Sequence, residues 1–213
     1  NADLISRGVG NTQGRVTLMN GVASIGQGFI TNAGATGSFP ISLAADLNAD
    51  GNADVVGSGA TNVRISQLNG TTVSSSGFLS NGSGAFTLNA NGAGDVNGDG
   101  KSDLIFNSAA NTRVNVMDGI TSTSSGFLSN GGGAFPFTMA ADLNNDGNAD
   151  LLSDGATNVR IQLVTFPAAT IVVTTGFLSN GGGVYDLAAA SDSSADGNDD
   201  LKFNSATQTR LNL

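Results

Sequence analysis

The chain has 213 residues, of which 39% are hydrophobic, and its 17 acidic and 8 basic side chains give a formal net charge of −9. All the acids are aspartate, and glutamate, histidine, cysteine and tryptophan are absent. This composition argues against collagen and general disorder, and it excludes His-based triads, thiol nucleophiles, Cys/His zinc sites and glutamate acid–base pairs. We therefore predict that the protein is not an enzyme. The negative charge argues against a nucleic-acid partner, and no apolar run is long enough to predict membrane insertion.

Four sets of residues recur along the chain with a common period. The segment Gly-Phe-Leu-Ser-Asn-Gly begins at Gly77, Gly126 and Gly176, at spacings of 49 and 50 residues, and a variant begins at Gly28. The other sets are acidic, basic and aromatic. The basic and aromatic sets are Arg15, Arg64, Arg113, Arg160 and Arg210, and Phe39, Phe86, Phe135 and Tyr185. Such repetition indicates that one structural unit is copied along the chain.

In chain order, the repeats divide a single domain, residues 1–213, into a partial blade (1–38), three complete repeats (39–85, 86–134 and 135–183) and a second partial blade (184–213). In the repeat 86–134, short strands are expected at 86–88, 103–106, 113–117 and 121–128, with a hairpin signal at Asp118-Gly119. Four short strands in about 50 residues predict an all-β fold, a β-propeller of four to five blade-like repeats. The main alternative is a β-solenoid.

The two ends of the chain do not complement each other. Residues 1–38 match strands two to four of a repeat, whereas residues 184–213 match strands one to three. Three arrangements stay open: five sheets with incomplete terminal blades, an open arc completed by another chain, or a piece of a longer array.

Each repeat carries one acidic loop, with oxygen-bearing side chains at positions 1, 3, 5 and 9 and glycine at position 6. Oxygen ligands suit a hard cation, and the glycine permits the sharp turn that brings the position-7 carbonyl into the ring of ligands. Calcium fits better than magnesium because the loop offers many protein oxygens. The candidate ligands are Asp46, Asn48, Asp50, Asn52 and Asp54; Asp95, Asn97, Asp99, Lys101 and Asp103; Asp142, Asn144, Asp146, Asn148 and Asp150; and Asp192, Ser194, Asp196, Asn198 and Asp200.

The charge count supports a metal-binding interpretation. Twelve aspartates lie at ligand positions of the four loops, and Asp3 matches position 9 of a truncated fifth loop, which accounts for 13 of the 17 acids. Four calcium ions would add eight positive charges and change the formal charge from −9 to −1. The alternative is a set of polar turns, but turn chemistry does not require acids at positions 1, 5 and 9. We expect the fourth loop to bind most weakly, because Ser194 replaces asparagine.

These Asp-x-Asn-x-Asp-Gly-x-x-Asp loops, joined to Gly-Phe segments and glycine-rich turns, resemble the FG-GAP or VCBS repeats of integrin-α-type β-propellers over nearly the whole chain. The resemblance implies calcium loops on a propeller and a location that is extracellular or at the cell surface. It does not imply one function, because members of this family include adhesion receptors, lectins and non-catalytic parts of enzymes.

The repeated arginines and aromatic residues each have a structural and a ligand-binding interpretation. The arginines either hold carbonyls or aspartates between neighbouring blades or line ligand sites, and we favour the structural role. The Phe78/Leu79, Phe127/Leu128 and Phe177/Leu178 pairs are predicted to lie in the core between blades. Tyr185 is expected in the core with a polar tip.

From these features we expect a calcium-stabilised extracellular structural or adhesive module that associates with copies of itself into an oligomer or filament. The low share of charged residues, 12%, and the near-zero charge of the calcium-loaded chain favour this function. The alternative is a multivalent carbohydrate-binding lectin with sites between blades, or a module that binds another surface protein. The absence of tryptophan argues against a lectin, because sugar sites commonly stack the sugar ring on an aromatic side chain.

Overall fold

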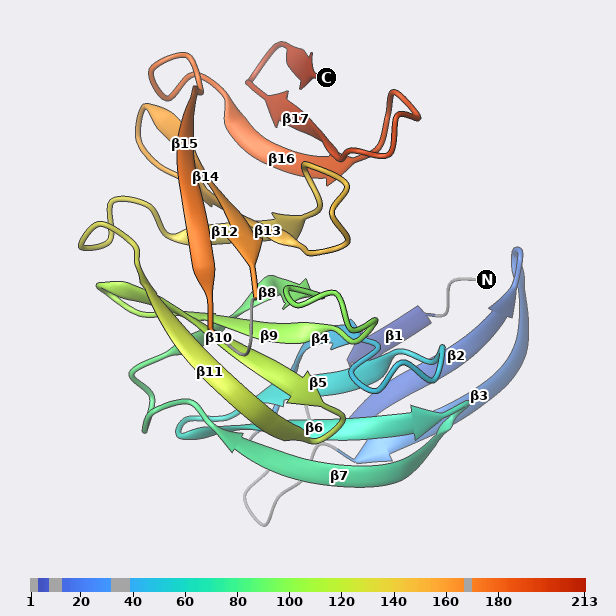
Figure 1. Cartoon of the computed structure of the whole chain (residues 1–213). Coiled ribbons are helices and arrows are strands. Elements are labelled where there is room, and N and C mark those ends of the chain that lie inside the picture. Colours follow the sequence, from blue (N-terminus) through green and yellow to red (C-terminus); the bar gives the residue numbers. More distant parts are fainter. Residues whose placement is uncertain (1–3, 8–12, 32–38, 167–169) are drawn as a thin grey trace.

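The computed structural model describes residues 4–7, 13–31, 39–166 and 170–213, and within these ranges the chain forms eighteen β-strands and no helix. The strands make five antiparallel sheets that follow one another around the molecule in chain order (Figure 1). These sheets are the blades of a β-propeller, so the all-β propeller predicted from the sequence is confirmed and the solenoid alternative is not. No helix in the described ranges could cross a membrane.

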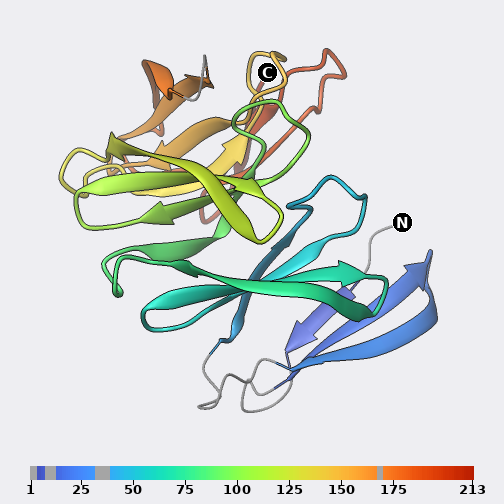
Figure 2. The same ribbon diagram turned by 60° about the horizontal axis from the view of Figure 1, so that its bottom comes forward.

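Each blade is a meander in which consecutive strands pair. The blades are β1 (Leu4–Arg7), β2 (Gln13–Asn20) and β3 (Ala23–Thr31); β4 (Ile41–Ala45), β5 (Asp54–Ser58), β6 (Asn62–Asn69) and β7 (Thr72–Ser80); β8 (Thr87–Gly94), β9 (Asp103–Asn107), β10 (Asn111–Asp118) and β11 (Thr121–Ser129); β12 (Phe137–Ala141), β13 (Asp150–Asp154), β14 (Asn158–Thr165) and β15 (Val172–Ser179); and β16 (Asp186–Ser191), β17 (Asp200–Asn204) and β18 (Thr209–Asn212). The first and last blades have three described strands each, and the middle blades have four. Figure 2 shows the first blade at one end of the series, beside β4–β7.

Four apolar clusters fill the spaces between successive blades, and β9 shows how the sequence builds them. Side chains alternate between the two faces of a strand, so Leu104 and Phe106 pack against the second blade while Ile105 packs against the fourth. Because both faces are covered, the second strand of each middle blade is a short apolar run rather than an alternating one. The cluster between the second and third blades, for example, joins Val56 and Ile65 to Leu104 and Met117.

In the second and third blades, the glycine of the Gly-Phe-Leu segment makes room for the next blade. A Cβ atom at Gly77 in β7 would lie 3.1 Å from Ile120 Cβ, which belongs to the β10–β11 hairpin of the following blade. Gly126 is equally constrained, because a Cβ there would lie 3.0 Å from Ile171 Cγ2. Glycine at this position therefore lets neighbouring blades approach closely at their outer strands.

The asparagine in each Gly-Phe-Leu-Ser-Asn-Gly segment is a buried turn residue. Asn130 donates from Nδ2 to the carbonyl of Ser108 at 2.9 Å, and its Oδ1 accepts the N–H of Gly133 at 2.8 Å. The turn also needs glycine, since Gly131 and Gly133 have φ angles of 70° and 89°, a region that other residues rarely adopt. Asn81 and Asn180 make the corresponding bonds.

Strand β8 departs from the other first strands. Leu88 pairs with Phe106, but the next pair is Ala93 with Leu104, so residues 89–92 bulge out of the sheet. Asn89 in the bulge donates to the carbonyl of Phe137 in β12 at 3.0 Å. The sequence signal is the spacing between the aromatic residue and the first aspartate, nine residues from Phe86 to Asp95 but seven from Phe39 to Asp46.

Candidate metal-binding loops

The four acidic loops connect the first strand to the second strand in the second to fifth blades, at residues 46–53, 95–102, 142–149 and 192–199. Each of the last three loops is tied to the preceding one by a backbone hydrogen bond. The N–H of Ser102 donates to the carbonyl of Asp46 at 2.7 Å, and the N–H of Asp199 donates to that of Asp142 at 2.8 Å. The loops therefore form a linked series on one side of the propeller.

The aspartate at position 1 organises the loop backbone. In the second blade, the Asp46 carboxylate accepts N–H groups from Gly51 at 2.9 Å and from Asp50 at 3.3 Å. Gly51 has a φ of 83°, and Ala49 at position 4 has a φ of 58°, although it is not glycine. The other three loops repeat both positive φ angles and the bond from the position-6 glycine to the position-1 carboxylate. This common geometry confirms the turn expected from the glycine at position 6.

Positions 3, 5 and 7 lie together on the exposed side of the loop. Asn48 donates from Nδ2 to Asp50 Oδ2 at 3.0 Å, and the backbone N–H of Asn52 donates to Asp50 Oδ1 at 2.8 Å. Hydrogen bonding to the carboxylate, above all by the Asn52 N–H, lowers the pKa of Asp50. The bond from the Asn198 N–H does the same for the pKa of Asp196 in the fourth loop. These carboxylates are therefore ionised and accessible at neutral pH.

The aspartate at position 9 behaves differently, because it is buried. Asp54 accepts the N–H of Leu47 at 3.2 Å on Oδ2 and the N–H of Leu68 in β6 at 2.9 Å on Oδ1. Asp103 and Asp150 make the equivalent pair of bonds, and Asp200 accepts the N–H groups of Ser193 and Ser194. In the first three of these loops the aspartate therefore joins the loop to the third strand of its own blade, a structural role that the sequence analysis missed, whereas Asp200 bonds within its loop.

Burial raises the pKa of these position-9 carboxyl groups, to about 6 for Asp54 and Asp150 and about 7 for Asp103. The two N–H donors oppose this shift, whereas the negative charges at positions 1 and 5 add to it. Each of these loops thus holds a buried carboxylate beside two more carboxylates. Such an arrangement concentrates negative charge that a bound cation would neutralise.

Few positive charges balance these loops. In the described ranges both ion pairs are made by Lys101, whose Nζ lies 3.0 Å from Asp118 Oδ1 and 4.0 Å from Asp99 Oδ2. In the same ranges, no three acidic side chains lie close enough together to hold a metal ion. Positions 1, 3 and 5 supply side-chain oxygens in one small loop, the donor type that calcium prefers, and position 9 adds a buried carboxylate. Asp3, assigned to a fifth loop, lies outside the described residues.

The arginine set has the structural role that we favoured. Arg113, Arg160 and Arg210 each donate to the carbonyl of a serine in the preceding blade, Ser80, Ser129 and Ser179 respectively, at 2.8 Å. Each guanidinium also lies over aromatic rings, including those of Phe86, Phe135 and Tyr185, at 4.7 to 5.2 Å from the ring centres. Tyr185 packs against the core and donates from its hydroxyl to Gln208 at 2.8 Å, as expected for a residue with a polar tip.

The prediction that the Phe-Leu pairs are core residues is wrong for the phenylalanines. Phe78, Phe127 and Phe177 are about 60% exposed, as is Phe29 at 67%. The leucines do face the core: Leu128 is buried, and Leu79 and Leu178 pack against buried clusters. The two residues are neighbours on a strand, so they point to opposite faces, and only one of them meets the following blade. The rings of Phe78, Phe127 and Phe177 each lie against a ring of their own blade, as Phe127 does against Phe86 with 5.7 Å between centres.

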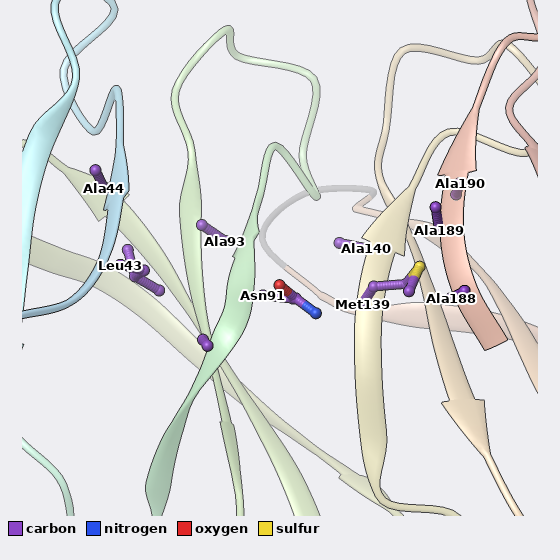
Figure 3. A pocket seen from close by; sticks show the side chains of 10 residues that line it. Leu43, Ala44, Asn91, Ala93, Met139, Ala140, Ala188, Ala189 and Ala190 are labelled. Atoms are coloured by element: carbon purple, nitrogen blue, oxygen red, sulfur yellow. The ribbon is translucent and has the colours of Figure 1, made fainter. Parts of the chain in front are cut away.

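A cavity of about 340 Å³ lies among the first strands at the centre of the propeller (Figure 3). Its lining is almost entirely alanine, with Leu43 and Met139, and its one polar side chain is that of Asn91 in the β8 bulge. Ligand sites normally bring several polar groups together, and this cavity does not. We therefore assign it no chemistry.

The fold and its loops define a class of protein, a β-propeller with one repeated aspartate loop per blade. The family model described as FG-GAP-like repeat matches residues 46–106 and 95–153, which together span 108 of the 213 residues. The chain belongs to the FG-GAP-like repeat family, as its resemblance to that family predicted.

Among solved structures, the chain is similar to part of a chain in the Tc holotoxin pore of Photorhabdus luminescens, with a TM-score of 0.54 and 15% sequence identity. The match covers 98% of this chain and 11% of that one, so the likeness concerns the propeller fold alone. The comparison with curated proteins found no match.

Proposed function

We propose that this protein is a non-catalytic, calcium-stabilised structural or adhesive propeller module that works outside the cell and associates with copies of itself. The observation that carries the calcium part is the buried carboxylate at position 9 of each loop. Asp54 and Asp150 have raised pKa values, lie beside two further loop carboxylates, and are within ion-pair distance of no basic residue in the described ranges. A divalent cation at each loop would stabilise the ionised carboxylates.

Calcium also supports the extracellular and self-associating parts of the proposal. Extracellular calcium modules bind with dissociation constants of about 10⁻⁴ to 10⁻³ M, which suit millimolar calcium outside the cell. Four ions would reduce the formal charge from −9 to −1, and the repulsion between copies would fall with it. Calcium would therefore both stabilise the blades and permit close contact between molecules.

The test is sedimentation velocity with electron microscopy, in calcium and in EDTA. We expect calcium-dependent oligomers or filaments together with a compact, folded particle. Binding of calcium is measured separately by isothermal titration, so that a stable monomer that binds calcium would refute self-association while leaving the calcium sites in place. Magnesium at the same concentration is the control for ionic strength.

The exposed phenylalanines favour the lectin as a second candidate. Phe29, Phe78, Phe127 and Phe177 repeat on the outer strands, and such rings can stack against sugars. Repeated weak sites would add avidity. A glycan array separates the candidates: binding of one glycan class by a monomer, lost in the variant Phe127→Ser together with Phe177→Ser, would favour the lectin.

A further inference from the structure

Each candidate calcium loop is joined to the next one through the residue at position 1. The backbone carbonyl of this residue accepts the N–H of the position-8 residue of the following loop. Position 1 is a candidate ligand, and position 8 directly precedes the buried aspartate at position 9. Each bond therefore connects the first ligand of one loop to the residue beside the last ligand of the next. The bonds run from Ser102 to Asp46, from Ala149 to Asp95 and from Asp199 to Asp142.

The residue at position 2 adds a second connection between a loop and the following blade. Leu47 is buried in the apolar cluster shared with the third blade, and its carbonyl accepts the N–H of Gly119 from that blade at 2.8 Å. Val96 is likewise buried in the cluster shared with the fourth blade. The N–H of each position-2 residue donates to the position-9 carboxylate of its own loop, Asp54 or Asp103. Through position 2, the buried carboxylate is thus linked to the packing between blades.

The third loop has close contacts with the loops on both sides of it. A Cβ atom at Gly98 in the second loop would lie 3.1 Å from Asn148 Oδ1 in the third. A Cβ atom at Gly197 in the fourth loop would lie 2.5 Å from Asn145 Nδ2, also in the third. The space available to one loop therefore depends on the conformation of its neighbours.

We propose that the four loops bind calcium with positive cooperativity, so that a filled loop raises the affinity of the loops beside it. This inference rests on the proposed calcium sites and specifies how they act together. An ion that restrains the residue at position 1 also restrains the position-8 residue bonded to it, so the neighbouring loop loses less conformational entropy when it binds. Coupling of this kind is reciprocal, and in a repeat protein it acts between adjacent repeats.

Electrostatics acts against this coupling. A filled loop carries less negative charge than an empty one and attracts the next ion less strongly. The aspartate at position 5 is exposed in all four loops, so solvent and salt screen this interaction. The hydrogen bonds between loops are direct contacts and are not screened in this way. We therefore expect the coupling through contacts to outweigh the electrostatic effect.

The test is a calcium titration of the whole chain followed in amide NMR spectra, where the position-6 glycines report the four loops separately. The N–H of each of these glycines donates to the position-1 carboxylate, so its signal should shift as the loop fills. The reporters are Gly51, Gly100, Gly147 and Gly197.

The first variant, Asp146→Ala, removes the position-5 carboxylate of the third loop. We expect the calcium midpoints of Gly100 and Gly197, in the adjacent loops, to rise at least about fivefold, and that of Gly51 to rise less. Charge by itself predicts the opposite change, because the empty third loop of the variant is more negative than the filled loop of the wild type.

A second pair of variants tests the connection without changing a candidate ligand. Asp199 lies at position 8, and its carboxylate accepts the N–H of Asp142 at 3.1 Å. Asp199→Ala and Asp199→Asn both remove the charge, but only the alanine variant removes the acceptor. We expect the Gly147 midpoint to be about two- to fivefold higher in Asp199→Ala than in Asp199→Asn. Circular dichroism checks that both variants are folded.

Two negative results are distinguishable from each other. Wild-type glycine signals that do not shift with calcium would refute the calcium sites themselves, and the coupling with them. Signals that shift in the wild type but keep their midpoints in Asp146→Ala would show that the loops bind independently. That result would overturn the cooperative coupling and leave the proposed calcium sites in place.

Discussion

The Nη2 atom of Arg113 donates a hydrogen bond of 2.8 Å to the backbone carbonyl of Ser80, across the boundary between the third and second blades. The same guanidinium lies between the rings of Phe86 and Phe106, at 4.7 and 4.6 Å from their centres. Burial lowers the pKa of Arg113, but an arginine remains charged throughout the physiological range. One repeated side chain thus connects successive blades by a hydrogen bond, while its guanidinium stacks on rings of its own blade.

Replacing this arginine should destabilise the propeller. We expect Arg113→Met to lower the free energy of unfolding by about 1–3 kcal/mol, because the Ser80 carbonyl loses its donor and the two rings lose the cation. Urea unfolding followed by circular dichroism measures the change. Arg15→Met is the matched control, since Arg15 is exposed, and it should change stability by less than about 0.5 kcal/mol. Equal losses in both variants would contradict the structural role.

Replacing the asparagine of the Ser-Asn-Gly turn should destabilise the propeller about as much as replacing Arg113. Asn130→Ala removes the bonds to Ser108 and Gly133 from a fully buried site, and we expect a loss of about 1–3 kcal/mol in urea unfolding. Asn91→Ala serves as the control. Asn91 is exposed and makes one long bond of 3.4 Å to the Thr138 carbonyl, so its loss should be within about 0.5 kcal/mol.

Removing calcium should lower the melting temperature. At about 1 mM free calcium, a site with a dissociation constant of about 10⁻⁴ to 10⁻³ M contributes roughly 0.4–1.4 kcal/mol, and four sites contribute about 2–6 kcal/mol. For a domain of this size that corresponds to a decrease of roughly 5–20 °C in EDTA. Differential scanning calorimetry measures it. An identical melting temperature in calcium and in EDTA, with a sample known to be calcium-loaded at the start, would exclude stabilising sites.

The second loop should bind calcium more tightly once its lysine is removed. The Lys101 ammonium lies 4.0 Å from Asp99 and 3.0 Å from Asp118, so it competes with a cation for the charge of the loop. We expect Lys101→Asn to tighten this site about two- to fivefold in isothermal titration. The reverse change in the third loop, Asn148→Lys, should weaken binding there. The second loop is then expected to be a weak site beside the fourth, in which Ser194 replaces asparagine.

Stability should depend on pH in opposite ways with and without calcium. In EDTA, the raised pKa values of Asp54, Asp103 and Asp150, about 6 to 7, mean that the fold favours their protonated forms. Their contribution is fully present below the unfolded pKa of about 4 and is lost as the pH rises to the folded pKa of 6 to 7, so the urea midpoint should fall between about pH 4 and pH 7. In calcium the midpoint should rise over the same interval, because the ion binds the ionised carboxylates.

Local features of this protein could be predicted from its sequence. The period of the Gly-Phe-Leu-Ser-Asn-Gly segment predicted a propeller of four to five blades, because each blade is a short meander whose strands and turns lie close together along the chain. Asp46, Gly51 and their equivalents predicted the loop conformation for the same reason, since the bonds that shape the loop join residues at most five positions apart.

Only the tertiary structure decided which face of each strand is covered. Phe127 and Leu128 are adjacent and similarly apolar, yet one is 58% exposed and the other 8%, because the neighbouring blade covers a single face. In the sequence, Asp54 cannot be distinguished from the other loop aspartates. In the fold, the N–H of Leu68 in β6, fourteen residues away, donates to its Oδ1 atom. Packing between blades joins residues about one repeat apart, and alternation along a strand by itself does not say which of its two faces the next blade will meet.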